Sequence, residues 1–134
     1  MTTKTFPAER DLLDDVTDFA MAELLALGCP KKSARQFILA LEELFVNVAS
    51  YAYGDGKGDV SFEICKDGDM AVICMIDSGK PFNPLDRPDP DTTLAAEDRK
   101  IGGLGIYMSK KLLDGMEYEY KDNQNRLTMK KSCV

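Results

Sequence analysis

The sequence predicts an α+β fold: a two-layer sandwich in which a mostly antiparallel mixed sheet carries three helices on one face. Three observations predict it. Two long segments near the N-terminus have helical spacing of apolar residues, two pairs of strand-like segments flank turn-like residues, and a third helical segment lies between the pairs. The chain has 134 residues, the length of about one domain, and we expect residues 1–134 to form a single domain.

The first part of the chain predicts a short strand and two helices. Residues 3–7 have the pattern of an edge strand that ends at Pro7. Residues 9–27 repeat apolar side chains at steps of three and four, which is typical of a helix, and Gly28 suits its C-terminal end. Residues 33–53 predict a second helix. Its middle is apolar on nearly every side, so we expect it to be buried.

Residues 60–66 and 70–77 predict a hairpin. They flank Asp67-Gly68, a pair typical of a type I′ turn. This turn makes Phe62 face Ile73 and places one apolar face of the hairpin toward the helices. That face consists of Val60, Phe62, Ile64, Ala71, Ile73 and Met75, with Asp77 at its end.

A long segment with the composition of a lid follows this hairpin. Residues 84–101 are rich in proline and acidic side chains and are too long for an ordinary connection, so we expect a lid over about residues 84–105. Gly102-Gly103-Leu104-Gly105 then opens a helix that reaches about Leu113. Residues 116–121 and 126–131 predict a second hairpin around residues 122–125.

The composition excludes several kinds of chemistry. The chain contains no histidine, so it has no Ser-His-Asp or Cys-His group, no histidine-ligated metal and no phosphorylated histidine of its own. The net charge is −6, which disfavours direct binding to nucleic acid or to an anionic membrane.

The cysteines and the chain start predict a cytoplasmic protein. The four cysteines form no Cys-x-x-Cys pair, and the first residues have no apolar core of a signal peptide. No apolar run approaches the ~18 residues of a membrane span. We therefore expect reduced thiols and a cytoplasmic location. In the predicted hairpin Cys65 faces Met70 rather than Cys74, which argues against a disulfide between Cys65 and Cys74.

Three groups of residues have the character of a functional site. Glu43 and Asn47 lie four residues apart, on one face of the second predicted helix. Asp77 ends a strand, and Gly79 after it would let a flat ring approach the backbone. The glycines of residues 102–105 begin a helix, whose free N–H groups favour anions. Taken singly, each group also fits a structural interpretation: a solvated strip, an ordinary turn and a hinge.

The order of these groups resembles one family. The segments LALEELFVNVASYAYGDG (39–56), MIDSGKPFNPLD (75–86), GGLGIYMSKKLLDGMEYEY (102–120) and NRLTMKK (125–131) are similar to the GHKL ATPases, and within them to the anti-sigma-factor serine kinases. The opening FPAERDLLDDV is also similar to that group. The resemblance covers nearly the whole chain and implies the Bergerat ATP-binding fold.

The resemblance also implies roles for individual residues. Glu43 matches the catalytic carboxylate, Asn47 the Mg²⁺ ligand, and Asp77 the carboxylate that binds the adenine amino group, with Gly79 beneath the ring. The implied cofactors are ATP and Mg²⁺. The implied cofactor-binding residues are Asn47, Asp77, Gly79, Pro81, Gly102, Gly103, Leu104 and Gly105.

The chain departs from the family pattern after the asparagine. Ser50 and Tyr51 stand where relatives often have a basic residue and a histidine. This departure concerns phosphate transfer more than ATP binding. Arg87, Arg99 and Lys100, in or beside the lid, offer cations, although a solvated lid also explains them.

The resemblance implies a function and partners. We expect an ATP-dependent protein serine kinase that acts as an anti-sigma factor and phosphorylates a serine of an anti-anti-sigma (STAS-type) protein. The alternative is an ATP-binding regulatory switch that binds a partner without kinase activity. The second face of the first hairpin has two interpretations, a homodimer interface, which is common in the family, or a surface covered by the terminal strands. It consists of Met70, Val72, Cys74 and Ile76.

Overall fold

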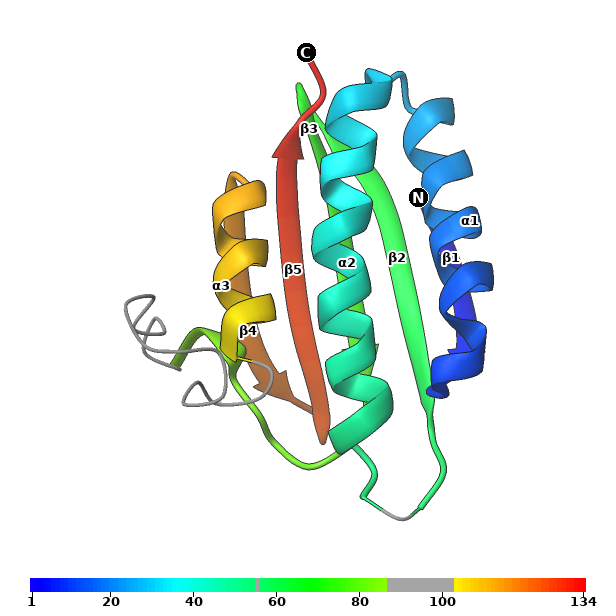
Figure 1. Cartoon of the computed structure of the whole chain (residues 1–134), viewed down its shortest axis with the longest axis vertical. Helices are drawn as coiled ribbons and strands as arrows, with labels where there is room; N and C mark the ends of the chain where they lie inside the picture. The colour runs from blue at the N-terminus through cyan, green and yellow to red at the C-terminus, as the bar shows by residue number, and fades with distance from the viewer. Residues whose placement is uncertain (55, 87–102) are drawn as a thin grey trace.

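The computed structural model describes residues 1–54, 56–86 and 103–134, and its architecture is the predicted α+β sandwich (Figure 1). One five-stranded sheet has the order β1-β2-β3-β5-β4. All four pairings are antiparallel, so the parallel component that a mixed sheet implies is absent from the described strands. The strands are β1 (Thr2–Pro7), β2 (Asp59–Asp67), β3 (Met70–Asp77), β4 (Gly115–Lys121) and β5 (Gln124–Ser132).

The helices of the described residues cover one face of this sheet, with α2 between α1 and α3 (Figure 1). They are α1 (Leu13–Ala26), α2 (Lys31–Tyr51) and α3 (Gly103–Leu112), and two 3₁₀ turns lie at Arg10–Leu12 and Pro84–Asp86. The helix α2 begins two residues earlier than predicted, because Pro30 occupies its N-cap position and needs no helical N–H there. Gly28 has a φ of 91°, as its place after α1 requires.

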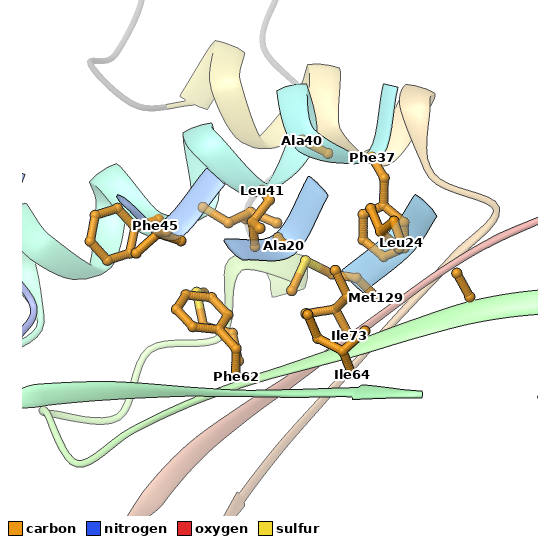
Figure 2. Packing of buried hydrophobic residues seen from close by; sticks show 14 of the residues in the cluster. Ala20, Leu24, Phe37, Ala40, Leu41, Phe45, Phe62, Ile64, Ile73 and Met129 are labelled. Atoms are coloured by element: carbon orange, nitrogen blue, oxygen red, sulfur yellow. The ribbon is translucent and has the colours of Figure 1, made fainter. Parts of the chain in front are cut away.

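The hydrophobic core lies between α1, α2 and the inner face of the sheet. Figure 2 shows Phe37, Leu41 and Phe45 of α2 pointing toward strand residues such as Phe62 and Ile73. All five are at most 1% exposed. Burying each such side chain contributes about 1.5–3 kcal/mol, so the middle of α2 is held in place over the sheet.

The first hairpin differs from the prediction in register. The expected turn at Asp67-Gly68 is wrong, because the turn consists of residues 68–69 and Phe62 pairs with Met75 rather than with Ile73. Among the described turn residues only Gly68 has a positive φ (60°), which is typical of a type II′ turn. A shift of two positions keeps every side chain on its face. The predicted inner face is therefore confirmed by its burial.

The second hairpin is tighter than predicted. The turn consists of Asp122 and Asn123 alone, with φ values of 55° and 62°, as a type I′ turn requires. The strand β5 therefore begins at Gln124, and Asn125 pairs with Asp77 of β3. The terminal strands extend the sheet beside β2 and β3. The interpretation in which they cover the outer face of the first hairpin is therefore wrong for the described strands.

A disulfide contradicts the expectation of reduced thiols. Cys29, in the turn between α1 and α2, is bonded to Cys133 after β5, and both are 6% exposed. Their separation of 104 residues hid the pairing, because only the folded chain brings these two segments together. Cys65 and Cys74 are free, as expected, although Cys65 pairs with Val72 in the sheet. In the described part of the chain, no helix is long and apolar enough to span a membrane.

Candidate functional site

A cavity of about 310 Å³ opens where α2 and β3 end and β5 begins. Its walls are largely apolar, with Leu44 and Val48 from the helix and Met75 and Leu127 from the sheet. The complete lining consists of Leu44, Asn47, Val48, Tyr51, Ala52, Met75, Asp77, Lys80, Phe82, Pro84, Tyr118, Asn125 and Leu127. An apolar cavity of this size with a few polar groups has the character of a small-molecule site.

The carboxylate of Asp77 is the buried charge in this cavity, with an exposure of 6%. Its Oδ1 atom accepts hydrogen bonds from the Gly79 backbone N–H (2.9 Å) and from Nδ2 of Asn125 (3.0 Å). Within the described residues, Oδ2 has no hydrogen-bond partner. A buried carboxylate oxygen without a donor is costly, so this oxygen favours a ligand that brings an N–H group.

Sequence reasoning missed Asn125, which is the centre of the polar network. Besides Asp77, its Nδ2 atom reaches the backbone oxygens of Lys80 (3.0 Å) and Gly79 (3.4 Å). Its Oδ1 atom accepts from the Phe82 backbone N–H (3.1 Å) and from the Tyr118 hydroxyl. Asn125 thus fixes both the carboxylate and the chain that leaves β3. The sequence does contain a signal for this position. Aspartate and asparagine tolerate positive φ values, so Asp122-Asn123 suits a two-residue turn, and such a turn places Asn125 within the strand.

The structure gives a reason for glycine at residue 79 that differs from the predicted contact with a flat ring. A Cβ atom there would collide with the backbone carbonyl of Ala52, at the end of α2. The Lys80 N–H donates to the same Ala52 oxygen at 3.0 Å. Gly79 itself is buried and does not line the cavity. The glycine therefore lets the segment after β3 pack tightly on the helix, while its contact with a bound ring remains a prediction.

Tyr53, just after α2, connects three segments near the cavity. Its hydroxyl donates to the Asp59 carbonyl (2.6 Å) and accepts from the Ser78 N–H (2.8 Å). It thereby links the chain after α2 to the start of β2 and the end of β3. Burial raises the pKa of the Tyr53 phenol, and the charges of Asp77 and Asp59 raise it further.

Asn47 and Glu43 lie on one side of α2, as predicted, but only Asn47 lines the cavity. Within the described part of the chain the Asn47 side chain makes no hydrogen bond, so its amide is available to a ligand. Glu43 lies one turn earlier and is exposed. Its carboxylate lies against Gly105 of α3, since a Cβ at Gly105 would collide with Glu43 Oε2.

The glycine segment is described only in part. Gly102 and residues 87–101 of the predicted lid lie outside the described residues. Gly103 begins α3, as predicted, and Leu104 belongs to the same turn. Pro81 is exposed and is not part of the cavity lining, although its neighbours Lys80 and Phe82 are.

The two residues that depart from the family pattern, Ser50 and Tyr51, are the last residues of α2. Tyr51 is 52% exposed and lines the cavity, so it provides an aromatic wall where relatives have histidine. Ser50 accepts a hydrogen bond from Nε of Arg10 at 3.0 Å. A guanidinium from the start of the chain therefore reaches the position where relatives carry a basic residue on the helix.

The described residues contain no cluster of three or more histidine, cysteine, aspartate or glutamate side chains that could hold a metal ion. A Mg²⁺ ion that arrives with phosphates needs less, because it keeps several waters and takes one or two protein oxygens. The amide oxygen of Asn47, which no described residue contacts by a hydrogen bond, fits that requirement.

Comparison with known proteins identifies the family of the chain. The family model of the histidine kinase-like ATPase domain matches residues 6–131, which is nearly the whole chain. The chain belongs to the histidine kinase-like ATPase domain family. Members of this family bind ATP, which is consistent with a cavity that contains the buried carboxylate of Asp77. No curated protein sequence matches the chain significantly.

A solved structure shows the same fold. A structure of the RsbU and RsbW domains of Rv1364c from Mycobacterium tuberculosis matches 98% of this chain with a TM-score of 0.63 and 14% identity. This chain covers 32% of that protein chain, about a third of its length. The histidine kinase AdeS of Acinetobacter baumannii matches 99% of this chain and 68% of its own, with a TM-score of 0.49 and 14% identity.

Proposed function

We propose that residues 1–134 form one ATP-binding domain that transfers the γ-phosphate of ATP to a serine of a partner protein. The observation that carries the ATP site is the Oδ2 atom of Asp77, which has no hydrogen-bond partner within the described residues. It is a buried acceptor at the end of an apolar cavity, and the adenine amino group is a donor on a flat apolar ring. Guanine presents a carbonyl oxygen at the same place and would meet the carboxylate with repulsion.

The phosphates would extend from this cavity toward Asn47 and the start of α3. Asn47 is the residue that would hold Mg²⁺, which neutralises phosphate charge during transfer. The free N–H groups of the first turn of α3, including those of Gly103 and Leu104, are suited to phosphate oxygens. We assign Gly102 and Pro81 to the same site on the family resemblance alone.

Glu43 is the residue proposed to accept the proton of the attacking serine hydroxyl. It lies one helical turn from Asn47, it is exposed, and it makes no hydrogen bond or ion pair within the described residues. A carboxylate that is accessible and uncommitted is able to take a proton from a protein substrate that docks beside the site.

The nature of the partner rests on similarity. The fold is shared with a structure that contains an RsbW domain, and the sequence resembles the anti-sigma-factor serine kinases. We therefore propose that the acceptor serine lies on an anti-anti-sigma (STAS-type) protein and that a sigma factor is the second partner. The lack of histidine agrees with a hydroxyl acceptor on another protein.

A second candidate is an ATP-dependent switch without phosphate transfer. Tyr51 and Ser50 favour it, because neither places a charge of its own beside the phosphates. Arg10 is engaged with Ser50 and would have to supply that charge.

Calorimetric titration tests the binding site. We expect wild-type protein to bind ATP and ADP, more tightly with Mg²⁺, and to bind GTP at least tenfold more weakly. Asp77→Asn should lose most ATP affinity, and Asn47→Ala should lose the Mg²⁺ dependence. Ser78→Ala, next to Asp77 on an exposed position, is the matched control. Absence of ATP binding by the wild type would refute the proposal.

A single-turnover reaction with labelled ATP and candidate partners then separates the two functions. A labelled phosphoserine on the partner, lost in Glu43→Ala, supports the kinase. Stable ATP binding with no phosphoprotein supports the switch.

A further inference from the structure

The helices α2 and α3 meet at a point where Glu43 and Gly105 have no room between them. A Cβ atom built at Gly105 would collide with Oε2 of Glu43 and would lie 3.1 Å from its Cδ and 3.4 Å from its Cβ. The three atoms nearest to that position all belong to Glu43. The space that a side chain at residue 105 would occupy is therefore filled by this one carboxylate.

The backbone conformation does not explain a glycine at this position. Among the described glycines, Gly28, Gly54 and Gly68 have positive φ values, and Gly105 does not. Gly105 lies inside α3, where alanine is the more favourable residue. The glycine is thus less favourable than alanine for its own helix, and within the described residues the group that fills the space of the missing Cβ is the Glu43 side chain.

A buried serine keeps the two residues opposite each other. Ser109, one turn after Gly105, is 0% exposed. Its Oγ atom lies 3.2 Å from the carbonyl oxygen of Ala40 on α2 and 2.9 Å from that of Gly105. The single hydroxyl hydrogen is shared between these two oxygens, so Ser109 links α3 to Ala40 of α2 one turn after Gly105.

We propose that Gly105 is a positioning residue for Glu43. The absent side chain leaves a place beside the first turns of α3 in which the carboxylate lies, and the partial positive charge of that helix end favours it there. A long exposed side chain otherwise samples several rotamers, so this contact restricts the proposed base. The inference rests on the proposed function, in which Glu43 takes the serine proton, and it gives Gly105 this role in place of the phosphate contact that the family resemblance implies for it.

The substitution Gly105→Ala tests the inference. The fold should be kept, because alanine favours a helix and the colliding group is the far end of an exposed side chain. The carboxylate is pushed aside, and displacement of a catalytic group by about 1 Å costs on the order of 100-fold in rate. We expect the phosphate transfer rate to fall by that order, while the Kd for ATP changes less than about twofold. Met108→Ala, on the exposed side of α3, is the matched control.

A double variant separates this role from direct contact with phosphate. In a Glu43→Gln background, which lacks the base, Gly105→Ala should reduce transfer no further. An equal fall in ATP affinity and transfer, or a reduction that persists in the Glu43→Gln background, would show that Gly105 acts on the nucleotide and would overturn the inference.

Nuclear magnetic resonance gives a readout without nucleotide. We expect Glu43→Gln to shift the Gly105 amide resonance, and the matched variant Glu42→Gln to leave it nearly unchanged. If Glu43→Gln also leaves it unchanged, the contact is absent and the inference is wrong, whatever the activity. If the contact is present but wild-type protein transfers no phosphate, the kinase function fails, and with it the role of Gly105 in catalysis.

Discussion

The substitution Asn125→Asp is the sharpest test of how the cavity is built. It keeps the size and shape of the side chain but replaces the Nδ2 donor by an acceptor. That atom lies 3.0 Å from Asp77 Oδ1 and 3.0 Å from the Lys80 carbonyl oxygen. In the wild type this atom donates to Asp77 Oδ1 and to the carbonyl oxygens of Gly79 and Lys80. In the variant it is an acceptor facing these three acceptors, and the carboxylates of residues 77 and 125 lie side by side in a buried site.

The magnitude follows from the distance. Two unit charges 3 Å apart repel by about 5 kcal/mol at an effective dielectric constant of about 20. Protonating one of the two carboxyls relieves this, and near pH 7 that protonation costs about 4 kcal/mol for a group that ordinarily titrates near pH 4. Protonation costs less than the repulsion, so its cost determines the loss of stability. We therefore expect Asn125→Asp to lower the free energy of unfolding by about 4 kcal/mol at pH 7.

The loss should also depend on pH. A protonated carboxyl at residue 125 donates the hydrogen bond that the amide donated, so the penalty shrinks as the pH falls toward 5. In the folded variant one carboxyl of the pair has a raised pKa. Its contribution to stability is therefore largest at low pH and is lost as the pH rises.

Urea unfolding at pH 5 and pH 7 measures both effects. Asn123→Asp is the matched control, because it is the same substitution in the exposed turn of the same hairpin. A difference between the two variants below about 1 kcal/mol at pH 7, or a difference that does not narrow at pH 5, would refute the reasoning. The variant should also bind ATP weakly, because Asp77 loses its orientation.

Three further predictions concern the junctions around the cavity and the cross-link. Cys133→Ser opens a loop of 104 residues and should lower the free energy of unfolding, measured in urea under oxidising conditions, by up to about 4–5 kcal/mol. Cys74→Ser removes a free thiol and should lower it much less. Equal losses in the two variants would contradict the cross-link. Tyr53→Phe removes two hydrogen bonds and should cost about 1–2 kcal/mol at pH 7. Because the Tyr53 pKa is raised in the folded state, its contribution is complete below pH 10 and is lost above it, so the variant should lose less stability than wild type between pH 9 and 11. Gly79→Ala forces a Cβ against the Ala52 carbonyl and should lower both the melting temperature and the ATP affinity, whereas an unchanged melting curve would show that the segment after β3 is loosely packed.

The sequence predicted the fold because its periodicities are strong. The helix α2 and the strand β3 carry long apolar patterns, so the faces of Asn47 and Asp77 followed from spacing alone. Both side chains line the cavity as a result. Faces in a sheet depend only on alternation, and they were correct even where the register was shifted by two positions.

Other features depend on contacts that no local pattern contains. Local residue types predict a second turn of four residues, which places Asn125 in a loop, whereas in the fold Asn125 pairs with Asp77. The pairing of Cys29 with Cys133 depends on the whole topology. The close approach of Gly79 to Ala52 depends on how two segments pack after folding, while the sequence alone shows a glycine near a strand end.

The cross-link should make local unfolding harder at one end of the sheet than at the other. The disulfide joins Cys29 to Cys133 just after the end of β5, whereas the cavity lies where β5 begins. The two ends of β5 lie at opposite ends of the sheet (Figure 1). The sheet near Asn125 is held by side-chain hydrogen bonds that a bound ligand should reinforce, whereas Lys131 lies two residues before the disulfide at Cys133. Protection from hydrogen exchange should therefore rise along a single strand, from the ligand end to the cross-linked end. Ligand binding should flatten that gradient.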